Sequence, residues 1–174
     1  MILDNYYKLV GWFSGRYNDM SNNYTAAIGV SDDTGTLIPD VLYNSSNNQY
    51  YATCANSNAT VRSTLSFRVG SGTTDPEIHD YTMETDVTGS FSNFKSDITV
   101  ACSVGKIMLT SVLTGINTSG SSVTINEIGL FKTLYCSSIG SVQKDIMLIH
   151  HKLDSPIVVA AGEGLDFPFQ WIEN

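Results

Sequence analysis

The chain has 174 residues, of which 42% are hydrophobic and 15% charged, and its nine basic and seventeen acidic side chains give a formal charge of -8. This length suits a single domain with a sizeable core. The acidic balance argues against nucleic acid as a partner, because binding to phosphates draws on clustered Lys and Arg. No stretch reaches the roughly 20 apolar residues that span a bilayer, and the first residues lack the pattern of a secretory signal, so we expect no membrane partner and synthesis in a cytoplasm.

The first segment, residues 1–23, is the one place where a helix competes with strands. Apolar side chains recur there at helical spacing, at Leu3, Tyr6, Tyr7, Val10 and Phe13. Gly11 and Gly15 weaken such a helix. The segment is also dense in aromatic residues, namely Tyr6, Tyr7, Trp12, Phe13 and Tyr17. We expect a short helix or a docking arm, with a core strand or a segment that packs on a neighbouring subunit as alternatives.

Residues 24–174 are typical of a β protein. Short extended stretches alternate with turns rich in Gly, Asn, Asp and Ser, at intervals near the 8 to 12 residues typical of sandwiches. The stretches are TAAIGV, LIPDVLY, YYATCA, STLSFRVG, ITVACSV, KIMLTSVLTGI, SVTINEIGLF, DIMLIHHKL, SPIVVAA and LDFPFQWI. No helix-sized period separates them. The sequence therefore predicts an all-β fold, a single antiparallel β-sandwich that is jelly-roll-like, from residue 24 to residue 174.

Three of these stretches predict how the sheets are covered. Residues 165–171 alternate apolar and polar side chains, and Pro168, which cannot donate to a ladder, indicates an edge strand or a bulge. Residues 146–149 and 106–113 are apolar on both faces, which a sheet with one solvated face does not need. A second layer of the same chain or a partner subunit must cover the additional face.

Glu127 interrupts the apolar face of the strand VTINEIGLF. Val123, Ile125 and Glu127 lie on one side of the pleat, whereas Ile128 and Leu130 lie on the other. We expect a bulge at Asn126 and Glu127 that turns the later residues into the core. The buried carboxylate would then accept hydrogen bonds from a nearby turn, for which the glycine-rich residues 70–76 are a candidate. The alternative is a Glu127 exposed to solvent at the end of a sheet.

The sequence indicates no catalytic, cofactor-binding or metal site. The loop GSGTTDP lacks the Lys of a phosphate-binding loop, and His150 and His151 point to opposite faces of a strand. No Ser or Cys stands in the context of a nucleophile elbow. The acidic turns at residues 32–33 and 75–77 lack the alternating ligands of a dedicated calcium loop, so we expect hydrated turns, with bound calcium as the alternative. The three Cys are widely spaced and are expected to be reduced thiols.

Three blocks resemble a family of tailed-bacteriophage virion proteins. They are FRVGSGTTDPEIHDYTMETDV, VTINEIGLF and LDSPIVVAAGEGLDFPFQWI, in this order along the chain. The resemblance implies a non-enzymatic β-sandwich subunit that repeats around a symmetric assembly in the neck, collar or tail. It also implies a homo-oligomer whose other partners are virion proteins, assembled in the cytoplasm of a bacterial host.

The aromatic residues at both ends of the chain are the candidate subunit contacts, because obligate interfaces favour aromatic side chains. They are Tyr6, Tyr7, Trp12, Phe13, Tyr17, Phe167, Phe169 and Trp171. The alternatives are a capsid decoration or head-fibre protein and a carbohydrate-binding or receptor-binding module, in which Trp12 and Trp171 would stack on sugar rings. A hydrolase that acts on host polysaccharide is the third class.

Overall fold

The computed structural model describes residues 1–6, 30–38, 43–44, 49–50, 65–103, 106–136 and 142–173. Residues 4–6 are helical, and one 3-10 turn, η1, spans Thr88–Ser90. The strands are β1 (Val30–Ser31), β2 (Leu37–Ile38), β3 (Tyr43–Asn44), β4 (Gln49–Tyr50), β5 (Leu65–Gly70), β6 (Phe91–Ser103), β7 (Lys106–Asn117), β8 (Val123–Cys136), β9 (Val142–Val159) and β10 (Gly164–Glu173). The expectation of a mostly β, antiparallel chain is confirmed.

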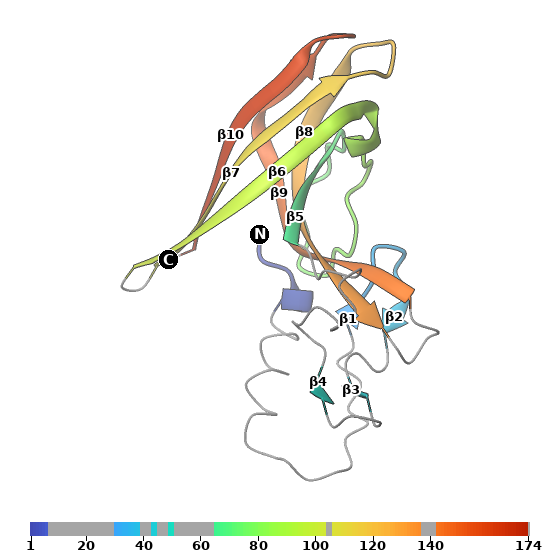
Figure 1. Ribbon diagram of the computed structural model, residues 1–174, viewed down its shortest axis with the longest axis vertical. Coiled ribbons are helices and arrows are strands. Elements are labelled where there is room, and N and C mark those ends of the chain that lie inside the picture. The colour runs from blue at the N-terminus through green and yellow to red at the C-terminus, as the bar shows by residue number, and fades with distance from the viewer. Residues whose placement is uncertain are drawn as a thin grey trace. The chain divides into compact units, whose positions relative to one another are not determined.

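Two three-stranded antiparallel sheets carry the long strands (Figure 1). One has the order β10-β7-β6 and the other the order β5-β8-β9, while β1-β2 and β3-β4 form short pairs. In β10, Pro168 lies opposite Val112 of β7, and among the described strands β10 has a neighbour on one side only. The predicted edge position of Pro168 is confirmed.

The chain divides into two compact units that the sequence did not indicate. Unit 1 comprises Met1–Leu65, Pro76–Thr82 and Leu130–His150, and unit 2 comprises Ser66–Asp75, Met83–Gly129 and His151–Asn174. Strands β8 and β9 contribute residues to both units. The boundary expected between residues 23 and 24 lies outside the described residues.

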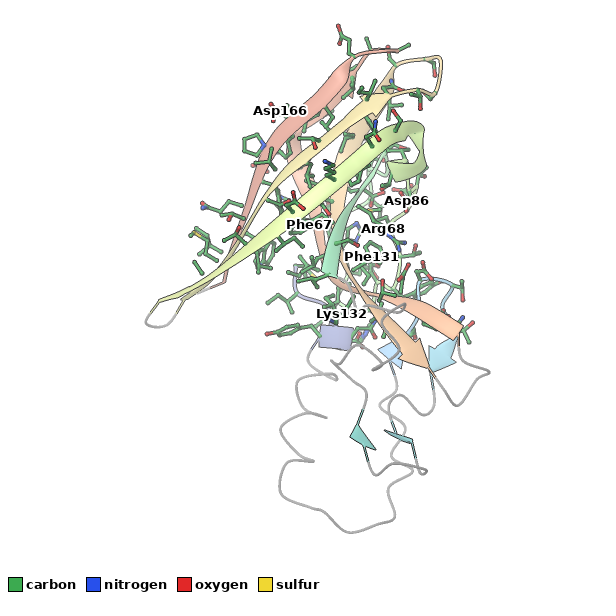
Figure 2. The ribbon with its side chains drawn as sticks, viewed as in Figure 1. Phe67, Arg68, Asp86, Phe131, Lys132 and Asp166 are labelled. Atoms are coloured by element: carbon green, nitrogen blue, oxygen red, sulfur yellow. The ribbon has the colours of Figure 1, made fainter. Side chains whose placement is uncertain are left out.

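In unit 2 the two sheets contact each other through aromatic side chains. Phe67 of β5, labelled in Figure 2, is 1% exposed and meets Phe169 of β10 edge to face, with ring centroids 5.1 Å apart. Such a pair contributes about 0.5 to 1.5 kcal/mol beyond its buried area. His151 of β9 adds ring contacts to Phe169 at 5.6 Å and to Trp171 at 5.9 Å. The backbone N–H of Phe67 also donates to Ser96 Oγ of β6 at 3.0 Å.

In unit 1 the first residues of the chain pair with β9. Leu3 N–H donates to the Leu148 carbonyl at 3.0 Å, and His150 N–H donates to the Met1 carbonyl at 3.0 Å. Leu3 is fully buried, and so are the side chains of residues 146–149, which are at most 8% exposed. Both faces of this apolar run are therefore covered within the chain, as one of the two alternatives predicted.

Strand β6 begins seven residues earlier than its apolar stretch, ITVACSV, predicted. Exposed side chains, among them Lys95, Asp97 and Thr99, alternate there with half-buried ones, so this part of the strand is polar. A register shift against β7 lies between Ser92 and Lys95, where Asn93 has a φ of 52°. This bulge and the exposed charges explain why the segment lacks the apolar signature of a strand.

Candidate functional site

The glycine-rich turn after β5 is held by the carboxylate of Glu84. Glu84 Oε2 accepts hydrogen bonds from Thr73 N–H at 2.7 Å, from Thr74 N–H at 3.0 Å and from the Thr74 hydroxyl at 2.9 Å. The backbone and hydroxyl bonds from Thr74, followed by the bond from Thr73, hold the pKa of Glu84 below its ordinary value. Because the ionised carboxylate is the better acceptor, these bonds favour its charged form.

Glu127 is the centre of this region and is 1% exposed. Its Oε1 accepts hydrogen bonds from Gly72 N–H at 2.9 Å and from Thr85 N–H at 3.1 Å, while Oε2 accepts one from Glu84 N–H at 3.3 Å. The expected hydrogen bond from the glycine-rich turn is therefore present at Gly72, and the alternative of an exposed Glu127 is wrong. Three backbone donors compensate for the burial of the charge.

Two glycines allow the turn to approach the carboxylate. An alanine Cβ at Gly70 would lie 2.7 Å from the Thr85 carbonyl oxygen and closer still to Glu127 Oε1. A Cβ at Gly72 would lie 2.6 Å from the same Oε1. The glycines are thus needed for space, since a side chain at either position would displace the hydrogen-bonded backbone.

Asn126, the neighbour of Glu127, binds the same turn from the other side of the strand. Its Nδ2 donates to the Ser71 carbonyl at 2.8 Å. Burial alternates from Val123 through Glu127, and the following residues are buried on both faces. That double burial accounts for Ile128 and Leu130 without a bulge, so the bulge at Asn126 and Glu127 stays a prediction. We refer to Gly70, Ser71, Gly72, Thr73, Thr74, Glu84, Thr85, Asn126 and Glu127 as the motif network.

Two ion pairs flank the motif network. Lys152 Nζ lies 2.8 Å from Asp75 Oδ1, and this hydrogen bond, together with the charge of Lys152, lowers the pKa of Asp75. Arg68 Nη1 lies 3.9 Å from Asp86 Oδ2, and both residues are labelled in Figure 2. These pairs are partly exposed and contribute little to stability compared with the buried carboxylate.

The hydrogen bonds decide which chemistry the motif network can perform. A phosphate-cradling loop needs free backbone N–H groups, but the N–H groups of Gly72, Thr73 and Thr74 already donate to the chain's own carboxylates. Both oxygens of Glu127 accept backbone hydrogen bonds, which lowers their availability as a general base. The network joins β8, the glycine-rich turn and residues 84–85 through hydrogen bonds.

The candidate subunit contacts have different environments. Phe169 is 7% exposed and belongs to the core of unit 2, so its predicted role as a subunit contact is corrected by its burial. Phe167 and Trp171 are half-buried, and their contact with a neighbouring subunit stays a prediction. Tyr6 is also half-buried. The remaining N-terminal candidates lie outside the described residues: Tyr7, Trp12, Phe13 and Tyr17.

The outer face of the β10-β7-β6 sheet carries exposed apolar side chains. It consists of the side chains that alternate with the buried ones, and it exposes Val112 by 49%, Ile116 by 46% and Ile172 by 46%. A groove of about 600 Å³ crosses it. The groove is lined by Asp97, Thr99, Thr110, Ser111, Val112, Thr114, Pro168, Phe169 and Gln170. Its lining combines hydroxyl, amide and carboxylate groups with the apolar side chains of Val112 and Pro168.

The acidic turn at residues 32–33 was expected to be hydrated, but the Asp32 carboxylate is held by other groups of the chain. Asp32 is fully buried, and its Oδ1 accepts hydrogen bonds from Thr34 N–H at 3.0 Å and Thr36 N–H at 2.9 Å. Lys144 Nζ donates to Oδ2 at 2.5 Å. Burial raises the pKa of Asp32, but the bonds from Lys144, Thr34 and Thr36 together outweigh burial and hold this pKa below 3.8. The carboxylate is thereby paired with the Lys144 ammonium and with backbone N–H groups of its own turn.

We expect Asp32→Asn to lower the free energy of unfolding by about 2 to 3 kcal/mol at pH 7. Since the pKa of Asp32 is lower in the folded chain, its stabilisation is complete above the unfolded value of about 4 and is lost as the pH falls through the folded pKa. The difference from the wild type in urea unfolding should therefore stay nearly constant from pH 7 to about pH 4 and shrink from there to pH 3. Asp166→Asn, at an exposed position of β10 (Figure 2), is the control and should change little. An undiminished difference at pH 3 would contradict the attribution of this stabilisation to the ionised Asp32 carboxylate.

A second polar pair in unit 1 was also missed from the sequence. His150, 4% exposed, has its Nδ1 2.7 Å from Asp80 Oδ2, and the same oxygen accepts a hydrogen bond from Glu77 N–H at 2.9 Å. Asp80 lies 70 residues from His150, so no local spacing could have joined them. The pair fixes the turn of residues 77–80 to β9.

Comparison with known kinds of site and with known proteins assigns no function to these residues. Within the described ranges, no three His, Cys, Asp or Glu side chains gather as a metal site. No helix in the part of the chain that the structure describes is long and apolar enough to cross a membrane. Comparisons with protein-family models, with curated proteins and with solved structures gave no match to this chain.

Proposed function

We propose that this chain is a non-enzymatic structural subunit of a tailed-bacteriophage virion that repeats in the neck, collar or tail region. Its two three-stranded sheets would form a β-sandwich with jelly-roll-like connections. Contacts between the sheets in unit 2, from Phe67 to Phe169 and from His151 to Trp171, support the sandwich.

The motif network is the single observation that carries the proposal. The blocks that resemble virion proteins lie far apart in the chain, yet Glu127 of INEIGL accepts hydrogen bonds from Gly72 of GSGTTDP and from Thr85 of YTMETDV. Motifs that act together in this way describe one local structure rather than separate chance matches. This coupling supports the resemblance on which the virion assignment rests.

The outer face of the β10-β7-β6 sheet supports a role in assembly. Val112, Ile116 and Ile172 expose nearly half of their area on one face. A contiguous exposed apolar surface marks a site of interaction with other proteins, and these three side chains would supply apolar contacts to such a site. A repeated subunit would cover such a face with other components of the particle.

The test is the composition of purified particles. We expect mass spectrometry of density-gradient-purified virions to detect the chain in many copies, and gold-labelled antibodies against it to decorate the neck, collar or tail in electron micrographs. Label on the head would instead indicate a capsid decoration or head-fibre protein. Absence of the chain from intact particles, with the chain present in the lysate, would reject the proposal.

A glycan-binding module is the second candidate, and the groove on the outer face favours it. Asp97 and Gln170 offer polar groups that could bind sugar hydroxyls beside the apolar surface of Pro168. Selective binding on a glycan array that Gln170→Ala abolishes would support this candidate. Equal signals from wild type and variant would remove it.

A further inference from the structure

Strand β6 presents a long edge whose charges are arranged for pairing with a copy of itself. In the order β10-β7-β6, β6 has a neighbour on one side only among the described strands. An open edge displays unpaired backbone N–H and C=O groups and is a template for another strand. Its regular part follows the bulge, where pairs with β7 run without a shift from Lys95 to Ser103.

Lys95 and Asp97 are exposed on the outer face of this edge. Neither side chain has an ion pair within the described ranges of the chain. They stand two residues apart, so both point to the same face of the strand. One charge of each sign makes this edge complementary to an antiparallel copy of itself, whereas charges of one sign would repel such a copy.

We infer that two copies of this chain pair antiparallel through β6, around a two-fold axis at Ser96. In that register Lys95 of each copy lies opposite Asp97 of the other, so two cross-strand ion pairs form on one face. Directly opposite side chains in an antiparallel pair have Cβ atoms about 4.5 to 5.5 Å apart, which suits ion pairs. The contact is isologous, as in most homodimers.

The charges select this register against its neighbours. A slip of the axis to Lys95 would place two lysines opposite each other, and a slip to Asp97 would place two aspartates opposite each other. A shift of one strand by a single residue relative to the other would instead pair outward-facing side chains of one copy with inward-facing side chains of the other. The same axis sets half-buried Phe94 opposite half-buried Ile98 on the inner face, which adds apolar contact.

The inference rests on the proposed function in one respect, since a subunit that repeats in a particle brings copies of the chain together. The paired edges would join two three-stranded sheets into one six-stranded sheet. The outer faces of both copies would then form one continuous surface that carries Val112 and Ile116 twice.

Sedimentation equilibrium of the full chain over a concentration series tests the contact. We expect a monomer–dimer equilibrium for the wild type. Lys95→Asp and Asp97→Lys each place two like-charged pairs across the axis and should weaken dimerisation by roughly tenfold to a hundredfold. The double variant K95D/D97K should restore the wild-type affinity, and an equimolar mixture of the two single variants should form heterodimers.

Asp166→Lys provides the matched control for Asp97→Lys, because it makes the same change of charge on β10, away from the axis, and should leave dimerisation unchanged. Circular dichroism and thermal unfolding establish that each variant is folded. A monomeric wild type, single variants that dimerise like the wild type, or a folded double variant that stays monomeric would each overturn the contact. If the chain is found in purified particles but is monomeric in solution, this contact is overturned and the proposed function stands. If the chain dimerises through β6 but is absent from particles, the contact stands and the proposed function is rejected.

Discussion

Glu127→Ala should lower the free energy of unfolding by about 3 to 5 kcal/mol, which makes it one of the most damaging single substitutions in unit 2. The wild-type carboxylate accepts hydrogen bonds from the backbone N–H groups of Gly72, Glu84 and Thr85. Removal of the side chain leaves these donors without their acceptor in a site where Glu127 itself is 1% exposed. Urea unfolding followed by tryptophan fluorescence and by circular dichroism measures the loss.

Two further variants test whether the lost hydrogen bonds cause the destabilisation. Glu127→Gln keeps one acceptor oxygen but directs an amide NH₂ toward backbone donors. We therefore expect its free energy of unfolding to lie between those of the wild type and Glu127→Ala. Glu163→Ala removes an exposed glutamate side chain and should change stability by about 0.5 kcal/mol or less. An unchanged melting temperature for Glu127→Ala would show that the motif network does not stabilise the fold.

Gly70→Ala should lower the free energy of unfolding by about 2 to 3 kcal/mol, because the site has no room for a methyl group. The new Cβ would lie 2.7 Å from the Thr85 carbonyl oxygen and would also press on Glu127. Relief requires a shift of backbone that Glu127 holds by hydrogen bonds. Urea unfolding of the variant gives the value directly.

Gly89→Ala is the control for this glycine, because an added Cβ there has no atom within 4 Å. It should be neutral or should stabilise the chain by up to about 1 kcal/mol. In the Glu127→Ala background, Gly70→Ala should cost about 1 kcal/mol less than in the wild type, since part of the clash is with the missing side chain. Strict additivity of the two substitutions would contradict the proposed contact.

The strands that sequence predicts well are those with a clear local pattern. The apolar stretches of β5, β7, β8 and β10 match the observed strands within a few residues, apart from a longer C-terminal end of β8. Strand β9 was expected as two stretches, DIMLIHHKL and SPIVVAA. It instead runs unbroken from Val142 to Val159. A proline is compatible with β9 because β9 is an edge strand among the described ones, and an edge strand has outward-facing positions that form no ladder bond.

In the candidate site too, some residues are recognisable from a local sequence pattern, whereas contacts between residues far apart in the chain are not. Glu127 was detectable because a charged residue stood on an apolar face of a strand, which asks for hydrogen-bond donors. Two of these donors, the N–H groups of Glu84 and Thr85, were not detectable, because a backbone donor carries no signature in its side chain. The ion pair of Asp32 and Lys144 joins residues 112 positions apart, a separation at which one sequence gives no indication of contact.

The pairing of the first three residues with β9 sets an order for folding on the ribosome. The partners of Met1 and Leu3 are His150 and Leu148, which leave the exit tunnel only when most of the polypeptide has been made. Until then the buried side chain of Leu3 has no final place in unit 1. Contacts of such long sequence separation form slowly and late. Nascent chains arrested before residue 148 should therefore hold their N-terminus open to protease, and chains released beyond residue 150 should protect it.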